Sequence, residues 1–343
     1  MMRLLKFILS LQLKSSGINN QTNGFTLIEL LVAMVLAVLV ITPLMAFMIN
    51  IMDSDRKEQA KTNTEQEIQA ALDYIARDLQ QAVYIYDADG VTRDQSNTNK
   101  TLWGIRDQIP PVKSAPSCSP TSASNPSVCT PILVFWKREF IANSVGISSN
   151  TQTSEAQTDD GYAYSLVAYY LITNPNNSNS TWSKEARIGR FQIRGKVNAL
   201  YANDKGNDPD TGFNPPPLSD NISGATLKER MNQWQTSLGA SENYGSDTPV
   251  VTLVDFISTT GPSITTNTAG VCPGTNASPK LVGSLSGGFF ACVDAEQVLA
   301  QVYLRGNALA RIQNNNLAYN DSRKNYFPTA SIRAQGRGFL FTK

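Results

Sequence analysis

The longest apolar run in the chain occupies residues 30–52, between Glu29 and Asp53, and carries no charge. A helix rises about 1.5 Å per residue, so a run of this length crosses a hydrocarbon core of roughly 30 Å. The pattern predicts a transmembrane helix over residues 25–52. Pro43 interrupts the run and frees the carbonyl of Leu39, so we expect the helix to bend or loosen there.

Residues 53–86 show a different pattern, in which apolar positions recur every three or four residues. They are Ile68, Leu72, Ile75, Leu79, Val83 and Tyr86. This spacing predicts an amphipathic helix that continues the span and packs one face on a domain. A membrane-surface helix is the alternative, but the polar face lacks the basic excess typical of that class.

Residues 87–343 are expected to form a β-rich domain. Runs rich in Val, Ile, Tyr and Phe predict strands at 132–140, 162–173, 186–197, 249–258 and 297–305, with a last strand near 327–333 docking at a sheet edge. The fold class is therefore α+β, with a long N-terminal helix packed on an irregular antiparallel β domain.

An insertion at about residues 201–248 interrupts this domain, and we expect it to be a solvated surface loop. Thr226 and Glu229 have capping-box spacing, which predicts a short helix through Trp234. Asp204, Asp208 and Asp210 form an oxygen-rich cluster that suggests calcium. An EF-hand register starting at Asp208 places Ser219 where a Glu is required, and an ordinary Asx-rich turn is the alternative.

The charges before the apolar run predict how the chain is oriented in the membrane. Arg3, Lys6 and Lys14 precede Gly24 without any acidic residue, so this end should be cytoplasmic and the β domain should lie on the other side. The whole chain has 29 basic and 28 acidic residues, which argues against a broad nucleic-acid-binding face.

The chain contains no histidine, which removes Ser-His and Cys-His catalysis. We find no acid pair in an apolar setting either, and therefore expect no enzyme activity. Cys118, Cys129, Cys272 and Cys292 lie beyond the span and favour two disulfides, most simply between sequence neighbours, although four cysteines allow three pairings. A zinc site is disfavoured because no CxxC spacing occurs.

Glu29 is the one charged residue of the predicted transmembrane helix over residues 25–52, so we expect it to have a partner. Stabilisation by the helix dipole is the other explanation. Gly24 has no Cβ and would let a peptidase approach the backbone closely, so the Gly24–Phe25 junction is a candidate cleavage site.

The sequence of residues 24–32, Gly-Phe-Thr-Leu-Ile-Glu-Leu-Leu-Val, resembles the processing and methylation motif of type IV prepilins and type II secretion pseudopilins. The resemblance implies that residues 1–24 are a leader cleaved after Gly24 by a prepilin peptidase and that Phe25 is N-methylated. It also implies an assembly role for Glu29, which would pair with the terminal ammonium of a neighbouring subunit. In this family a proline such as Pro43 is associated with local melting of the helix in the filament.

The length of the chain resembles that of the larger, J-type minor pseudopilins. Residues 303–309 and 327–341 resemble cyanobacterial hormogonium polysaccharide secretion pseudopilins. The resemblance implies a single-pass protein of the inner membrane with a periplasmic domain. Its partners would be other pseudopilins or minor pilins and the inner-membrane assembly platform. The expected role is a filament subunit near the tip that supports export of protein or polysaccharide; an adhesin or glycan-binding minor pilin is the alternative.

Overall fold

The computed structural model describes residues 24–122, 127–146, 158–174, 181–197, 209–218, 222, 224, 226–262, 272 and 280–338. The chain divides into two compact units, Met1–Asp55 and Arg56–Lys343. Helix α2 (Leu27–Gln80) contributes residues to both units. The β-rich unit also contains two sheets and several short helices.

One face of the C-terminal half of α2 is buried. Its buried positions follow the helical repeat and are Ala60, Thr64, Ile68, Ala71, Leu72, Ile75, Ala76, Asp78 and Leu79. This confirms that the long helix packs on the β domain. Burial begins at Ala60, whereas residues 24–59 are exposed.

The helix ends at Gln80, earlier than the predicted end at Tyr86. Residues 82–85 instead form strand β1 (Ala82–Ile85), with all four side chains buried. This run is apolar at every position, so it can be buried on both faces of a sheet, whereas an amphipathic helix would bury only one stripe. The three- and four-residue spacing of Val83 and Tyr86 was therefore a misleading signal.

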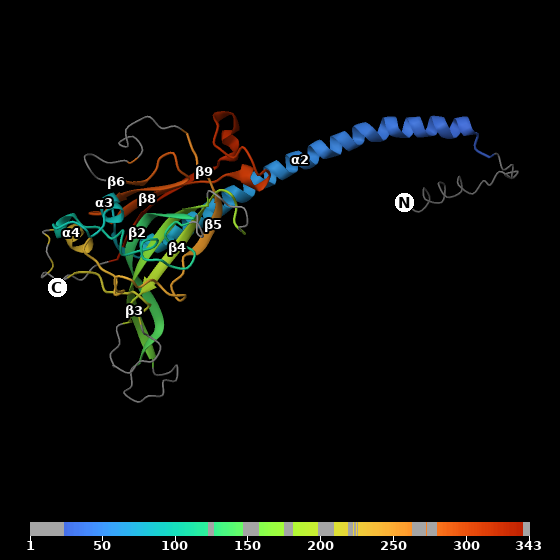
Figure 1. The fold of residues 1–343 in the computed structure, drawn as a ribbon. Coiled ribbons are helices and arrows are strands. Elements are labelled where there is room, and N and C mark those ends of the chain that lie inside the picture. Colours follow the sequence, from blue (N-terminus) through green and yellow to red (C-terminus); the bar gives the residue numbers. More distant parts are fainter. Residues whose placement is uncertain are drawn as a thin grey trace, which may run out of the picture. The chain divides into compact units, whose positions relative to one another are not determined.

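The first sheet is antiparallel and has the order β1-β2-β3-β4-β5. Its other strands are β2 (Val128–Gly146), β3 (Thr158–Thr173), β4 (Ala186–Arg194) and β5 (Val251–Ile257). Figure 1 shows β2, β3, β4 and β5 side by side. Each long strand confirms a predicted run, while β1 was missed.

The second sheet has the order β6-β7-β8-β9 and is also antiparallel. Its strands are β6 (Lys280–Gly283), β7 (Phe289–Asp294), β8 (Leu299–Arg305) and β9 (Thr329–Gln335). Strand β9 lies at the sheet edge, as predicted (Figure 1). The sequence patterns did not reveal β6 and β7, because β6 is short and β7 is apolar on both faces without alternation.

Short helices connect these strands. They are α3 (Ala88–Thr92), α4 (Leu227–Met231) and the 3-10 helices η1 (Lys100–Leu102), η4 (Ala308–Arg311) and η5 (Asp321–Tyr326). In α4 the Thr226 hydroxyl accepts from the Glu229 amide and the Glu229 carboxylate accepts from the Thr226 amide. The predicted capping box is therefore confirmed.

The described part of the insertion is not a solvated loop. Met231, Trp234 and Tyr244 are buried in the main core. The Trp234 indole N–H donates to the carbonyl of Asn214 (2.8 Å) and the Tyr244 hydroxyl donates to that of Gln108 (2.8 Å). The expectation failed because the polar, Pro-rich composition hid a few large side chains whose partners lie far away in sequence.

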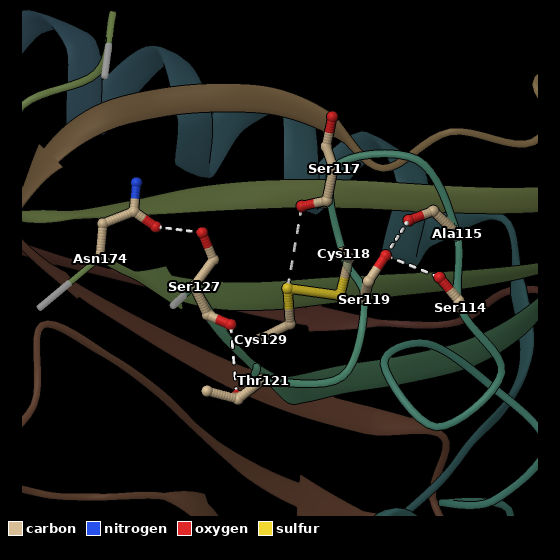
Figure 2. The surroundings of a disulfide bond; sticks show 9 residues. All are labelled: Ser114, Ala115, Ser117, Cys118, Ser119, Thr121, Ser127, Cys129 and Asn174. Carbon is tan, nitrogen blue, oxygen red and sulfur yellow. Dashed lines mark hydrogen bonds between the residues drawn. A yellow bond between two sulfur atoms is a disulfide. The ribbon is translucent and has the colours of Figure 1, made fainter. Parts of the chain in front are cut away.

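The two disulfides join the expected sequence neighbours, Cys118 with Cys129 and Cys272 with Cys292. Figure 2 shows the first, which ties a tight turn to the beginning of β2. Backbone hydrogen bonds between Ala115 and Cys118 close that turn. The second disulfide attaches Cys272 to strand β7.

Candidate processing and assembly site

Residues 24–26 lead directly into helix α2, which begins at Leu27. The Thr26 carbonyl accepts hydrogen bonds from the amides of Glu29 (3.1 Å) and Leu30 (3.2 Å). The Thr26 hydroxyl also accepts from the Glu29 amide, at 3.3 Å. Thr26 thus satisfies amide groups that the start of a helix otherwise leaves without partners.

Gly24 is exposed, and a Cβ added to it would meet nothing within 4 Å. Packing inside this chain therefore does not require glycine at position 24. A requirement for glycine would have to come from another molecule that approaches this backbone, as the active site of a peptidase does.

Glu29 lies in the first turn of α2, where the helix dipole favours a negative charge. It is exposed, and apolar side chains surround its place in the sequence. Phe25 is 80%, Leu27 85% and Ile28 66% exposed. The N-terminal half of α2 is long and apolar enough to cross a membrane.

Residues 19–45 match a family described as the prokaryotic N-terminal methylation motif. The match includes Gly24, Phe25 and Glu29, for which the family resemblance implies cleavage, methylation and assembly. The chain carries a type IV pilin-like N-terminus. No curated protein and no solved structure matches the chain.

Pro43 lies in the apolar half of this pilin-like N-terminus, and α2 continues as a helix on both sides of it. Just before it, the Thr42 hydroxyl donates to the carbonyl of Val38 (2.7 Å). Pro43 itself has no amide hydrogen to give to Leu39. The local melting that the family resemblance implies for a filament stays a prediction.

The predicted calcium ligands fall largely outside the described residues. Asp204 and Asp208 are among those that the structure does not describe. Asp210 is described, and its carboxylate accepts from the backbone amide of Arg194 (2.7 Å). Within the described ranges, no group of three or more His, Cys, Asp or Glu side chains is arranged to hold a metal ion. The calcium site therefore stays a prediction.

A buried ionic cluster centred on Asp78 was missed by the sequence patterns. Asp78 accepts from Lys137 Nζ (3.0 Å), Arg190 Nε (2.8 Å) and the Tyr169 hydroxyl (2.7 Å). Burial alone would raise the pKa of Asp78, but Arg190 and Lys137 outweigh it and hold that pKa below its ordinary value. The cluster joins α2 to strands β2, β3 and β4.

The sequence did contain a signal for this cluster. Asp78 follows Ala71 and Ile75 at helical spacing, so it belongs to the apolar stripe and not to the polar face. Lys137 likewise interrupts the apolar run of a predicted strand. Charges that break two apolar patterns in this way are expected to pair with each other.

Proposed function

We propose that the chain is a minor pseudopilin, a subunit of a filament related to type II secretion systems and type IV pili. The observation that carries the proposal is the methylation motif, placed at an accessible junction just before an exposed apolar helix. A prepilin peptidase would cleave after Gly24, and Phe25 would become the methylated N-terminus. The subunit itself then performs no chemistry and needs no cofactor.

Assembly would occur by packing of the apolar half of α2 against the same helix of other pseudopilins or minor pilins. In a bilayer a carboxylate without a partner is costly. Glu29 lies about one helical turn from the new amino terminus, so it can pair with the terminal ammonium of a neighbouring subunit. This pairing would set the register between subunits.

The basic residues Arg3, Lys6 and Lys14 support an inner-membrane placement with the β domain in the periplasm. Two disulfides in that domain agree with an oxidising compartment. A β-rich unit of this size would crowd a subunit stacked above it, which supports a position near the filament tip. There the subunit would assist the export of protein or polysaccharide across the outer membrane.

The decisive experiment is intact-mass and peptide mass spectrometry of the protein extracted from membranes of a cell that contains a prepilin peptidase. We expect an N-methylated Phe25 terminus. Gly24→Leu is a suitable comparison, because a Cβ at this position meets nothing in the chain, so the fold should persist while cleavage is lost. A wild-type protein that keeps residues 1–24, or is cut elsewhere, would disprove the proposal.

A further inference from the structure

A groove of about 640 Å³ lies on the β-rich unit, outside the pilin-like N-terminus. Its walls come from the segment that carries Trp182, from the end of strand β5 and from the segment after helix η4. Glu67 of α2 lies on its rim. The volume falls within the range of small-molecule sites, about 300–1,000 Å³.

The groove is held in shape by one carboxylate. Asp255 accepts hydrogen bonds from the Ser183 amide, the Ser183 hydroxyl and the Phe256 amide, each at 2.8 Å. The segment that carries Trp182 is thereby fixed to the end of β5. A site that is formed before the ligand arrives pays less ordering entropy on binding.

The floor of the groove is strained. Phe256 has a φ of 60°, a left-handed conformation that bulky side chains rarely adopt. Residues held in such conformations are energetically costly and concentrate at functional sites. The Arg311 guanidinium lies 4.1 Å from the centre of the Phe256 ring.

Arg311 is itself fixed by two residues of α2. Its Nε donates to the Thr64 hydroxyl (2.9 Å), and it forms an ion pair with Glu67. Thr64 is buried, so the arginine is anchored in the helix that supports the unit. Phe256 thus donates its amide to Asp255, and its ring lies against the Arg311 guanidinium.

The chemistry of the lining is aromatic and polar but nearly neutral. Trp182 is a large side chain left 42% exposed. Glu67 is paired with Arg311, and the other two charged residues of the lining, Asp255 and Lys184, carry opposite charges. Lys184, Gln313 and Asn314 add further polar groups.

We propose that this groove binds a neutral oligosaccharide of pyranose sugars. The C–H face of a pyranose ring is apolar and matches the part of Trp182 that stays exposed, since the Arg187 guanidinium lies 5.5 Å from the centre of that ring. The sugar hydroxyls both donate and accept and match the Asn314 amide and the side-chain oxygen of Gln313, whose Nε2 already donates to the carbonyls of Asn315 and Asn316. An anionic sugar would gain Lys184 but would also meet the Asp255 carboxylate, and the Arg187 guanidinium beside Trp182 is buried. The proposal goes beyond the filament role and does not depend on cleavage at Gly24, so each can fail without the other.

The test uses the full-length protein in a zwitterionic detergent, because detergents with sugar headgroups would compete for the groove. Cellohexaose, maltohexaose and a galacturonate hexamer are titrated by isothermal calorimetry. We expect saturable binding of at least one neutral hexamer and weaker binding of the galacturonate. Trp182→Ala should weaken the neutral interaction by about tenfold or more, because the sugar would lose the aromatic face on which it stacks.

Phe140→Ala is the matched control, because Phe140 is an aromatic side chain 54% exposed that does not line the groove. It should leave the affinity unchanged, and a thermal melt should show that both variants are folded. The proposal is overturned if neither neutral hexamer binds at up to about 10 mM, if galacturonate binds more tightly, or if Trp182→Ala binds as the wild type does.

Discussion

Asp78 is the residue whose environment differs most from what its place in the sequence suggested. It sits in a helix with many charged neighbours, yet it is buried against the first sheet, where Lys137 and Arg190 neutralise it. Such a cluster contributes little net stability compared with apolar residues of the same size. Its effect is to specify one position of α2 against β2 and β4.

Replacing Asp78 with Asn should destabilise the β-rich unit by about 3–5 kcal/mol, because Lys137 and Arg190 would be left buried without their counter-charge. The measurement is chemical denaturation of the detergent-solubilised protein followed by tryptophan fluorescence. Asp73→Asn, at an exposed position of the same helix, should change the unfolding free energy by less than about 0.5 kcal/mol. Equal effects of the two substitutions would contradict the assignment.

Two carboxylates predict how stability depends on pH: Asp78, and Asp89, which forms ion pairs with Lys228 and Lys280. Arg190 and Lys137 hold the pKa of Asp78 below its ordinary value in the folded protein. Burial alone would raise the pKa of Asp89, but Lys228 and Lys280 lower it to about 2. A depressed pKa contributes stability that is present above the unfolded value and is lost as the pH falls through the folded value.

We therefore expect the melting temperature to be insensitive to these groups between pH 5 and 7 and to fall as the pH drops from about 4 to about 2. Thermal melts across that range measure the effect. The decrease should be smaller in Asp78→Asn, which has no carboxylate to protonate. If the melting temperatures of the wild type and of Asp78→Asn fell equally over this pH range, Asp78 would not contribute to the pH dependence.

Helix α2 combines an exposed apolar half with a half that is buried along one face. Its N-terminal half exposes apolar side chains along its whole length, as Leu36 (57%) and Phe47 (65%) illustrate. Its C-terminal half buries one stripe in the core of the β-rich unit. Of the two halves, only the C-terminal one is buried by other residues of this chain.

Leu72→Ala should therefore destabilise the β-rich unit by about 2–5 kcal/mol, because Leu72 is 1% exposed and its removal leaves a cavity between helix and sheet. Tyr74→Ala is the comparison two residues away, at a position that is 45% exposed. It should cost far less. Denaturant midpoints at a constant m-value would separate the two, and a Leu72→Ala midpoint equal to that of the wild type would contradict this packing.

At the level of the assembled filament, the proposed role of this chain rests on Glu29, in the first turn of α2. Glu29→Ala should leave cleavage at Gly24 intact and reduce incorporation into filaments. Losing one partner of a buried ion pair costs about 3–5 kcal/mol, so the assembled fraction should fall by about tenfold or more. The measurement is co-purification with other pseudopilins after crosslinking in membranes.

Glu65→Ala is the control for this experiment, since Glu65 is an exposed acid on the same helix but outside the apolar half. It should assemble as the wild type does. If Glu29→Ala assembled equally well, the carboxylate would be serving only the helix N-terminus through the dipole.

Features that depend on nearby residues could be predicted from the sequence. The apolar run, the motif at Gly24, Phe25 and Glu29, the Thr226 capping box and the longer strands all follow from local spacing. The sequence favoured disulfides between neighbouring cysteines but allowed three pairings, and the structure has the expected one. Local patterns identify such elements because the interactions that form them span only a few residues.

The end of α2 and the burial of certain polar residues depend instead on contacts between distant parts of the chain. Strand β1 begins at Ala82 because β2 lies beside it, although residues 82–86 fit a helical repeat. Asp78 is buried because three distant strands supply its partners, and the groove beside Trp182 is assembled from segments far apart in the chain. These outcomes depend on long-range contacts, which override local preference and leave little trace in the spacing of residues.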